Sequence, residues 1–114
     1  MNETSVALLQ GSLAVLVLKT LSWGPLHGFG IARWIQHLSD DALQLKEGSL
    51  YPALYAMENR GWVKAEWRLT ENNRRAKYYR LTAAGRKQLT QESATFLRYA
   101  ALMVRVLRST EQPV

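Results

Sequence analysis

The sequence predicts a mainly α-helical fold with one small β-hairpin. Apolar residues recur at three- and four-residue steps in four separate segments, which is the spacing of helices with one buried face. After Gly61 the pattern changes to alternation, and a polar stretch over residues 71–75 divides the alternating part into two runs. At 114 residues, of which 47% are hydrophobic, the chain is long enough for a single core, so we expect one compact unit.

The first two helices are expected from Val6 to Leu21 and from Gly28 to Leu38. Trp23-Gly24-Pro25 ends the first helix, because a proline disfavours the helical conformation in the residue before it and a glycine permits the turn. Ser39-Asp40-Asp41 ends the second helix. The stretch from Leu43 to Lys46 then alternates between apolar and polar residues, which predicts a very short strand.

A third helix is expected to open at Glu47-Gly48-Ser49 and to end at Gly61. Ser49 is the expected N-cap, and Pro52 is expected in the first turn, where its missing N–H group costs nothing. The inner face of this helix is predicted to consist of Leu50, Leu54 and Met57.

Two alternating runs, from Trp62 to Trp67 and from Ala76 to Leu81, predict the hairpin. A last helix follows, with Thr82 as its N-cap, and continues to about Ser109. The order of three helices, a hairpin and a final helix is that of a winged helix-turn-helix domain with a C-terminal helix.

The positive charge is concentrated in the middle of the chain. Of a formal net charge of +6, residues 60–80 carry +5, with seven basic and two acidic side chains, whereas residues 1–59 carry −2 and residues 81–114 carry +3. Such clustering is typical of a surface that binds a polyanion. The alternative, which is the commoner cause of a basic run, is that these charges are only solvated.

The sequence offers no pattern of residues for catalysis, for a metal or for a cofactor. It contains no cysteine, which excludes disulfides and thiolate metal sites, and His27 and His37 are not in an HExxH arrangement. P-loop, GxGxxG and GxSxG motifs do not occur. The one adjacent acidic pair, Asp40-Asp41, has no partner base. We therefore expect no enzyme activity, no metal and no cofactor.

The apolar stretch from Leu8 to Leu21 is expected to be a core helix, not a membrane span. A span needs roughly 20 apolar residues, and this stretch also lacks a basic leader and a cleavage-like site. Without cysteines the sequence fits a reducing compartment, so we expect a cytoplasmic protein with no membrane association. The polar interruptions of the stretch are Gln10, Gly11, Ser12, Lys19 and Thr20.

The start of the third helix is the best candidate for a binding surface. Its first turn would offer free backbone N–H groups, the Ser49 hydroxyl and the Tyr51 phenol, which suits contact with phosphates and entry into the major groove of DNA. The alternative is that Ser49 only caps the helix and that the tyrosines only pack. The candidate DNA contacts of this segment are Lys46, Ser49, Tyr51, Pro52 and Tyr55.

The hairpin adds a second set of candidate contacts. Arg74, Arg75 and Lys77 lie at its tip and on its second strand, and Arg68 and Arg80 lie further down. Long basic side chains there can reach phosphates or the minor groove, so we expect double-stranded DNA as the partner. The alternative is a charged edge that prevents aggregation through the sheet.

Four motifs resemble those of PadR-type transcriptional regulators, in order and at similar spacing, over about residues 8–108. What the resemblance implies is a dimeric repressor that binds inverted repeats near promoters and dimerises through its C-terminal helix. It places Ser49, Tyr51 and Pro52 of the third helix against DNA, with Arg74, Arg75 and Lys77 of the wing. The motifs are Leu26-His27-Gly28-Phe29-Gly30-Ile31, Gly48-Ser49-Leu50-Tyr51-Pro52-Ala53-Leu54, Met57-Glu58-Asn59-Arg60-Gly61-Trp62-Val63 and Lys77-Tyr78-Tyr79-Arg80-Leu81-Thr82-Ala83-Ala84-Gly85.

The sequence departs from the family pattern at two places. Phe29 stands where the usual motif has a tyrosine, and many relatives carry a basic residue near Tyr55 or Ala56. Because of the second departure, it stays open whether the middle of the third helix contacts bases or phosphates. A winged-helix module that binds a protein partner instead of DNA is the alternative function, because a fold alone does not fix function.

The last helix carries an independent signal for a homodimer. A seam of residues spaced 4, 3, 4, 3 and 4 apart is typical of a coiled coil, so we expect a winged helix-turn-helix unit over residues 1–81 and a dimerisation helix over residues 82–114. The alternative is that this helix packs back on the first helix of its own chain. The seam consists of Leu89, Ser93, Phe96, Ala100, Met103 and Leu107.

The family resemblance also raises the question of a small aromatic effector. Some relatives bind flat aromatic molecules between the two subunits, and the aromatic residues that could line such a pocket here are Trp23, Phe96 and Tyr99. The alternative is that these side chains belong to the core, which is the more common role of aromatic residues at helical spacing.

Overall fold

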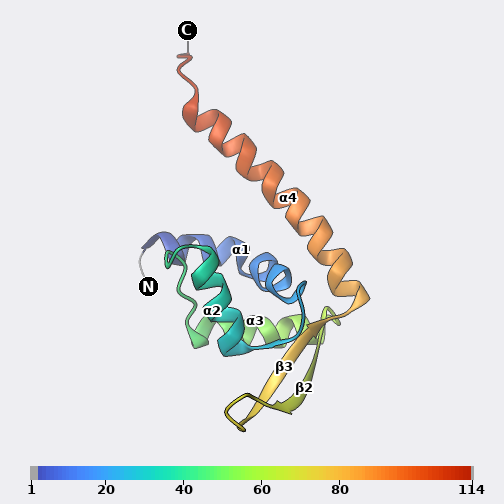
Figure 1. Ribbon diagram of the computed structural model, residues 1–114. Helices are drawn as coiled ribbons and strands as arrows, with labels where there is room; N and C mark the ends of the chain where they lie inside the picture. The colour runs from blue at the N-terminus through green and yellow to red at the C-terminus, as the bar shows by residue number, and fades with distance from the viewer. Residues whose placement is uncertain (1–2, 114) are drawn as a thin grey trace.

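The computed structural model describes the backbone of residues 3–113 and the side chains of residues 12–113. Three helices form a body, a hairpin projects from one end of it, and a long helix leaves it in another direction (Figure 1). The elements, in chain order, are α1 (Glu3–Leu21), β1 (Leu26–His27), α2 (Gly28–Leu38), α3 (Glu47–Asn59), β2 (Val63–Leu69), β3 (Arg75–Leu81) and α4 (Ala83–Arg108). This is the winged helix-turn-helix arrangement that the sequence predicts.

The core lies between α1, α2, α3 and the base of the hairpin. Each of these elements contributes apolar side chains that are almost fully buried, and the predicted inner face of α3 is among them. The core therefore fixes the outer face of α3 and the direction of the hairpin at the same time. Its members are Val17, Leu18, Leu21, Ile31, Ile35, Leu50, Leu54, Met57, Val63, Tyr79 and Leu81.

Two of the predicted helix boundaries have a clear hydrogen-bonding basis. Gly61 has a φ angle of +76°, and the N–H groups of Gly61 and Trp62 donate to the carbonyls of Glu58 and Met57, both at 3.0 Å, which closes α3. At the start of α4 the Thr82 hydroxyl oxygen accepts the Gly85 N–H at 3.0 Å, as expected of an N-cap.

The predicted N-cap of α3, Ser49, is wrong by three residues. The helix begins at Glu47, and its N-cap is Lys46, which makes no side-chain capping bond. Ser49 lies inside the helix, so its hydroxyl is not used as a cap. Pro52 is also deeper than expected, beyond the first turn, and because it has no N–H group the Gly48 carbonyl lacks the usual helical bond from four residues ahead.

The short strand expected over Leu43 to Lys46 is not formed. These residues are irregular, and Leu43 and Leu45 instead pack against the core from the connection between α2 and α3. The third strand of the sheet is β1, which precedes α2. It pairs antiparallel with β3 through Leu26 opposite Tyr79, so the strand order is β1-β3-β2.

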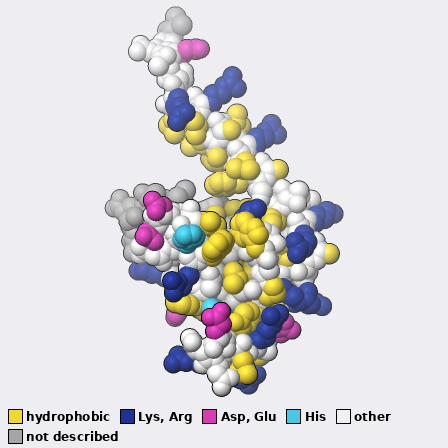
Figure 2. All heavy atoms as spheres, viewed as in Figure 1, with side chains coloured by type: hydrophobic (Ala, Val, Ile, Leu, Met, Phe, Trp, Pro, Cys, Tyr) yellow, Lys and Arg dark blue, Asp and Glu magenta, His cyan; other side chains and the backbone are white. Residues whose placement is uncertain are grey.

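The long helix α4 is covered by the body only along its first half. Leu89 packs against the core, and the helix faces α1 around Phe96. Beyond that point α4 extends away from the body with apolar side chains on its surface (Figures 1 and 2). Met103 and Leu107 of the predicted seam are 45% and 76% exposed. Within the part of the chain that the structure describes, no helix is long and apolar enough to cross a membrane.

The close approach of α4 to the base of the hairpin predicts a strong effect of Gly85→Ala. A Cβ atom at residue 85 would overlap the backbone carbonyl of Trp62, which cannot rotate away as a side chain could. We expect the variant to lose about 1–3 kcal/mol of unfolding free energy, as for other overpacked sites. Urea denaturation at a fixed protein concentration measures this loss.

Gly48→Ala is the matched control for this prediction. Residue 48 is also a helical glycine, but a Cβ atom there would meet nothing within 4 Å. Alanine should raise the stability of this site by about 0.5–1 kcal/mol, because glycine loses more conformational freedom in a helix. Equal effects of the two substitutions would contradict the steric explanation.

Candidate nucleic-acid interface

The outer face of α3 presents hydroxyl and small apolar groups to solvent. Ser49, Tyr51, Pro52, Tyr55 and Ala56 are all exposed, while the opposite side of the helix is buried. The Ser49 hydroxyl makes no hydrogen bond to any residue that the structure describes. It is therefore available to an external partner, which removes the alternative that Ser49 serves only as a cap.

Tyr51 is held in place by the start of α2. A Cβ atom at residue 28 would lie 2.6 Å from the Tyr51 hydroxyl oxygen, so only a glycine allows the phenol to rest against the backbone there. The preceding His27 caps α2, since its Nδ1 atom accepts the Gly30 N–H at 2.9 Å. The ring of His27 also contacts Tyr78 edge-on, with a centroid distance of 5.2 Å.

One face of the hairpin continues from the core towards its tip and carries both aromatic and basic side chains. Val63 pairs with Leu81 in the core, and further along the same face Trp67 pairs with Lys77 and Leu69 pairs with Arg75. Beyond the core this face has no apolar partner, and Trp67 remains 59% exposed. The wing therefore turns a mixed aromatic and cationic surface towards α3.

The basic side chains of the wing differ in how they are held. The Arg75 guanidinium lies 5.1 Å from the centre of the Trp67 ring, in a cation–π contact. The Lys77 ammonium is 3.4 Å from a carboxylate oxygen of Glu58 on α3. The Arg74 guanidinium makes no hydrogen bond, ion pair or ring contact with the residues that the structure describes. Arg74 and Arg75 therefore keep their charges available, whereas Lys77 is partly neutralised.

A groove of about 600 Å³ separates α3 and the start of α2 from the wing. It brings Tyr51 together with Arg74, Arg75 and Lys77, four of the side chains that the sequence singles out. Lys46, Ser49, Pro52 and Tyr55 lie outside this groove. Lys and Arg side chains surround the hairpin end of the molecule (Figure 2).

The electrostatic character of the two walls is different. The α3 segment from Glu47 to Asn59 contains two acidic residues and no basic residue, whereas the wing is strongly basic. Burial raises the pKa of the Tyr79 phenol, which lies below the groove, and the neighbouring Lys77 opposes this shift. The positive potential of the groove therefore comes from its wing side.

Phe29 and Trp67 line the groove from opposite sides, and neither is among the DNA contacts that the sequence predicts. Both side chains are exposed, as is that of Leu69 on the same face of the hairpin as Trp67. The sequence does indicate that Trp67 is exposed. In the alternating run it falls on the same face of the strand as Val63, but it lies too far along the strand to be covered by the core.

The three aromatic residues considered for an effector pocket are not brought together within one chain. Trp23 contacts Trp34 and lines a hollow beside α2. Phe96 lines a separate apolar hollow between α1 and α4, and Tyr99 is exposed on α4. Among the described residues there is no group of three or more histidine, cysteine, aspartate or glutamate side chains placed to hold a metal ion.

Solved structures of transcriptional regulators have the same fold. A regulator from Clostridium thermocellum is 25% identical, with a TM-score of 0.78 over 87% of this chain and 96% of that chain. A PadR family regulator from Clostridium difficile is 27% identical, with a TM-score of 0.72 over 85% of this chain and 99% of that chain. A PadR-like regulator from Bacillus cereus, at 20% identity and a TM-score of 0.77, covers 90% of this chain and 98% of that chain and supports the fold alone.

The sequence itself matches a family model over the whole recognition region. The Transcriptional regulator PadR-like family matches residues 17–91, which include α2, α3 and the complete hairpin. The resemblance seen in the four sequence motifs is therefore confirmed, and with it the winged helix-turn-helix fold. The chain belongs to the PadR-like family of transcriptional regulators, which are DNA-binding proteins and not enzymes.

Proposed function

We propose that this protein is a dimeric repressor that binds an inverted-repeat operator, with α3 in the major groove and the wing against the adjacent backbone. The observation that carries this proposal is the groove between Tyr51 on one side and Arg74 and Arg75 on the other. It joins a neutral, hydroxyl-bearing helix face to two cationic side chains that have no carboxylate partner among the described residues.

The two parts of the interface suit different kinds of contact. Hydroxyl groups of Ser49 and Tyr55 can bond to base edges, and the small apolar surfaces of Pro52 and Ala56 fit against thymine methyl groups. Because α3 itself has no basic residue, phosphate contacts fall to Lys46 at its start and to the wing arginines. The wing and Lys46 thus supply most of the affinity, and α3 supplies the sequence preference.

The uncovered half of α4 supports a homodimer. Several of its apolar side chains are exposed, among them Met103 and Leu107 of the predicted seam, and exposed apolar patches often mark contacts between chains. A two-fold pair joined through α4 and α1 would present its recognition helices to successive major grooves, about 34 Å apart. Such a complex would repress by occluding a promoter, and we propose that it does so in the cytoplasm.

Loss of the wing charges should weaken binding to all DNA and reduce its dependence on salt. In the double variant Arg74→Ala/Arg75→Ala, two phosphate contacts are removed, so the slope of log affinity against log salt should fall by about two. The affinity should fall by roughly tenfold or more for each arginine, as for other charge-assisted hydrogen bonds. Fluorescence anisotropy with the intergenic DNA upstream of the gene, at several salt concentrations, measures both quantities.

Arg86→Ala/Lys87→Ala is the control for this experiment. It removes the same net charge from exposed positions at the start of α4, away from the groove, and should leave the slope unchanged. An unchanged slope in the wing variant would remove the wing from the interface. If the unmodified protein showed no salt-sensitive, sequence-preferring binding, the protein-partner alternative would replace the repressor proposal.

Trp67→Leu should lower DNA affinity without changing the salt slope. The indole orders the Arg75 guanidinium before binding, and an exposed cation–π contact contributes about 0.5–1 kcal/mol, so we expect a loss of about two- to fivefold. No cation is removed, which is why the slope should remain. Trp67→Phe should restore part of the affinity in the same anisotropy assay. A full loss with phenylalanine would show that the ring is not what positions Arg75.

The exposed seam of α4 predicts that Met103→Glu/Leu107→Glu converts the dimer to a monomer. Charged side chains would be forced into the apolar contact, where they have no partner. Light scattering after size-exclusion chromatography should then give the 13.0 kDa of a single chain instead of twice that mass. Arg105→Glu, about 200° around the helix from Met103, should remain a dimer. A monomeric unmodified protein would contradict this part of the proposal.

A further inference from the structure

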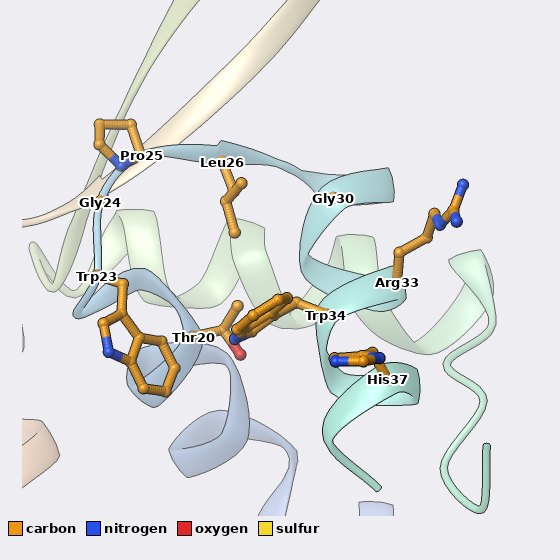
Figure 3. Close-up of a pocket in the computed structure, with 9 residues that line it drawn as sticks. All are labelled: Thr20, Trp23, Gly24, Pro25, Leu26, Gly30, Arg33, Trp34 and His37. Atoms are coloured by element: carbon orange, nitrogen blue, oxygen red, sulfur yellow. The ribbon is translucent and has the colours of Figure 1, made fainter. Parts of the chain in front are cut away.

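Two ion pairs occur among the described residues of this basic chain, and one of them joins α3 to the wing. The Lys77 ammonium of β3 lies 3.4 Å from a carboxylate oxygen of Glu58 on α3. The other pair, Arg68 with Glu66, lies within β2. Other basic side chains are unpaired: Arg33 on α2 extends outward at the rim of the hollow beside that helix, with no carboxylate partner among the described residues (Figure 3). The contact between α3 and the wing is therefore selective.

Lys77 lies on the side of the wing that lines the groove. It is on the same face of β3 as Arg75, and both residues line the groove together with Tyr51. Residues two apart on one strand are separated by about 7 Å, so a DNA backbone bound by Arg75 would pass within reach of the flexible Lys77 side chain. By its position alone Lys77 would contact a phosphate, as the family resemblance implies.

The Lys77 ammonium has two partners inside the protein. Glu58 lies in the last turn of α3, where the carbonyl groups at the end of the helix add to the negative charge of its carboxylate. The ring of the buried Tyr79 lies 5.8 Å from the ammonium. The side chains of Lys77 and Glu58 are 38% and 35% exposed, so the pair is already partly removed from water.

We propose that Glu58 keeps Lys77 from contacting DNA and so limits the phosphate contacts of the wing to Arg74 and Arg75. This inference rests on the proposed function. The pair contributes little to stability in water, but DNA that covers the groove would exclude water from it and strengthen it. If Lys77 turned to a phosphate instead, the Glu58 carboxylate would be left unpaired beside a polyanion. Both effects favour an intact pair in the complex.

Glu58→Gln tests the proposal, because it keeps the size of the side chain and removes its charge. Lys77 would then bind a phosphate, so the slope of log affinity against log salt should become steeper by about one, and the affinity should rise about tenfold. The rise should be equal for the intergenic DNA upstream of the gene and for a random duplex of the same length, since a phosphate contact carries no sequence information. Fluorescence anisotropy with the full-length protein measures these quantities.

The double variant Glu58→Gln/Lys77→Met separates the effect of the pair from a direct effect of the carboxylate. It removes both charges, so its slope and affinity should return to those of the unmodified protein. If Glu58 only repelled phosphates, the double variant would keep the higher affinity of Glu58→Gln.

Glu111→Gln is the control for net charge. It removes one negative charge from an exposed side chain beyond α4, at the opposite end of the molecule from the wing, and should leave the slope unchanged (Figure 1). Thermal unfolding checks that each variant is folded. A gain in affinity, which is the result expected for Glu58→Gln, cannot arise from a loss of structure.

Three results would overturn this inference alone. The first is an unchanged salt slope in Glu58→Gln. The second is a double variant whose slope is shallower by about one than that of the unmodified protein, because Lys77 would then contact DNA despite Glu58. The third is a double variant that keeps the gain of Glu58→Gln. Failure of the proposed function is distinguishable, because the unmodified protein itself would then show no salt-sensitive binding to DNA.

Discussion

The backbone carbonyl of Trp62 is the point on which the arrangement of the DNA-binding elements depends. It accepts a hydrogen bond from the Thr82 N–H group at 3.1 Å, and Gly85 of α4 lies directly against it. The Thr82 hydroxyl donates to the neighbouring Gly61 carbonyl at 2.6 Å. The N–H group of Trp62 in turn closes the end of α3 on Met57. The recognition helix, both strands of the wing and α4 therefore meet at one residue, and their relative orientation follows from a few short backbone contacts.

This junction relates the proposed recognition surface to the proposed dimer surface. The wing leaves it in one direction and α4 in another, so the angle between them is set where Thr82 ends β3 and begins α4. A second restraint between wing and helix is the ion pair of Lys77 with Glu58, which joins β3 to α3 further from the core. Such a half-exposed pair contributes little energy in water. It joins the wing to α3 and leaves Arg74 and Arg75 as wing cations without a carboxylate partner among the described residues.

The sequence predicts an element correctly where the residue preferences that make the pattern visible also stabilise that element in the folded chain. The bounds of α2, the cap at Thr82 and the stop at Gly61 follow from periodicity and from the preferences of single residues, so they are visible in the chain itself. The start of α3 was missed because serine and proline preferences favour a helix that begins at Ser49. In the folded chain, Lys46 instead takes an extended conformation and accepts the first helical bonds.

Features that depend on distant pairing left no local signal. β1 is two residues long and exists because Leu26 and His27 lie beside β3, more than fifty residues later in the chain. The same holds for the site: the basic wing was visible as a charge cluster, but the pairing of Lys77 with Glu58 and the stacking of Arg75 on Trp67 require the folded hairpin. Trp34 reads in the sequence as an ordinary helical apolar residue, and its edge-on contact with Trp23 also depends on the folded chain.

In the proposed interface the cationic groups lie on the wing and at Lys46, whereas the contacts from α3 are uncharged. This division affects how the protein would distinguish its operator from other DNA. A recognition helix without basic residues gains little from any phosphate, so its contribution differs between sequences and is small on random DNA. In the proposed complex the wing arginines would bind every sequence about equally and would lose strength as salt rises. Rising ionic strength should therefore lower the affinity for the operator and for other DNA by about the same factor, because the wing contribution is common to both. The ratio of the two affinities, which the neutral contacts of Ser49, Pro52 and Tyr55 would set, should change little.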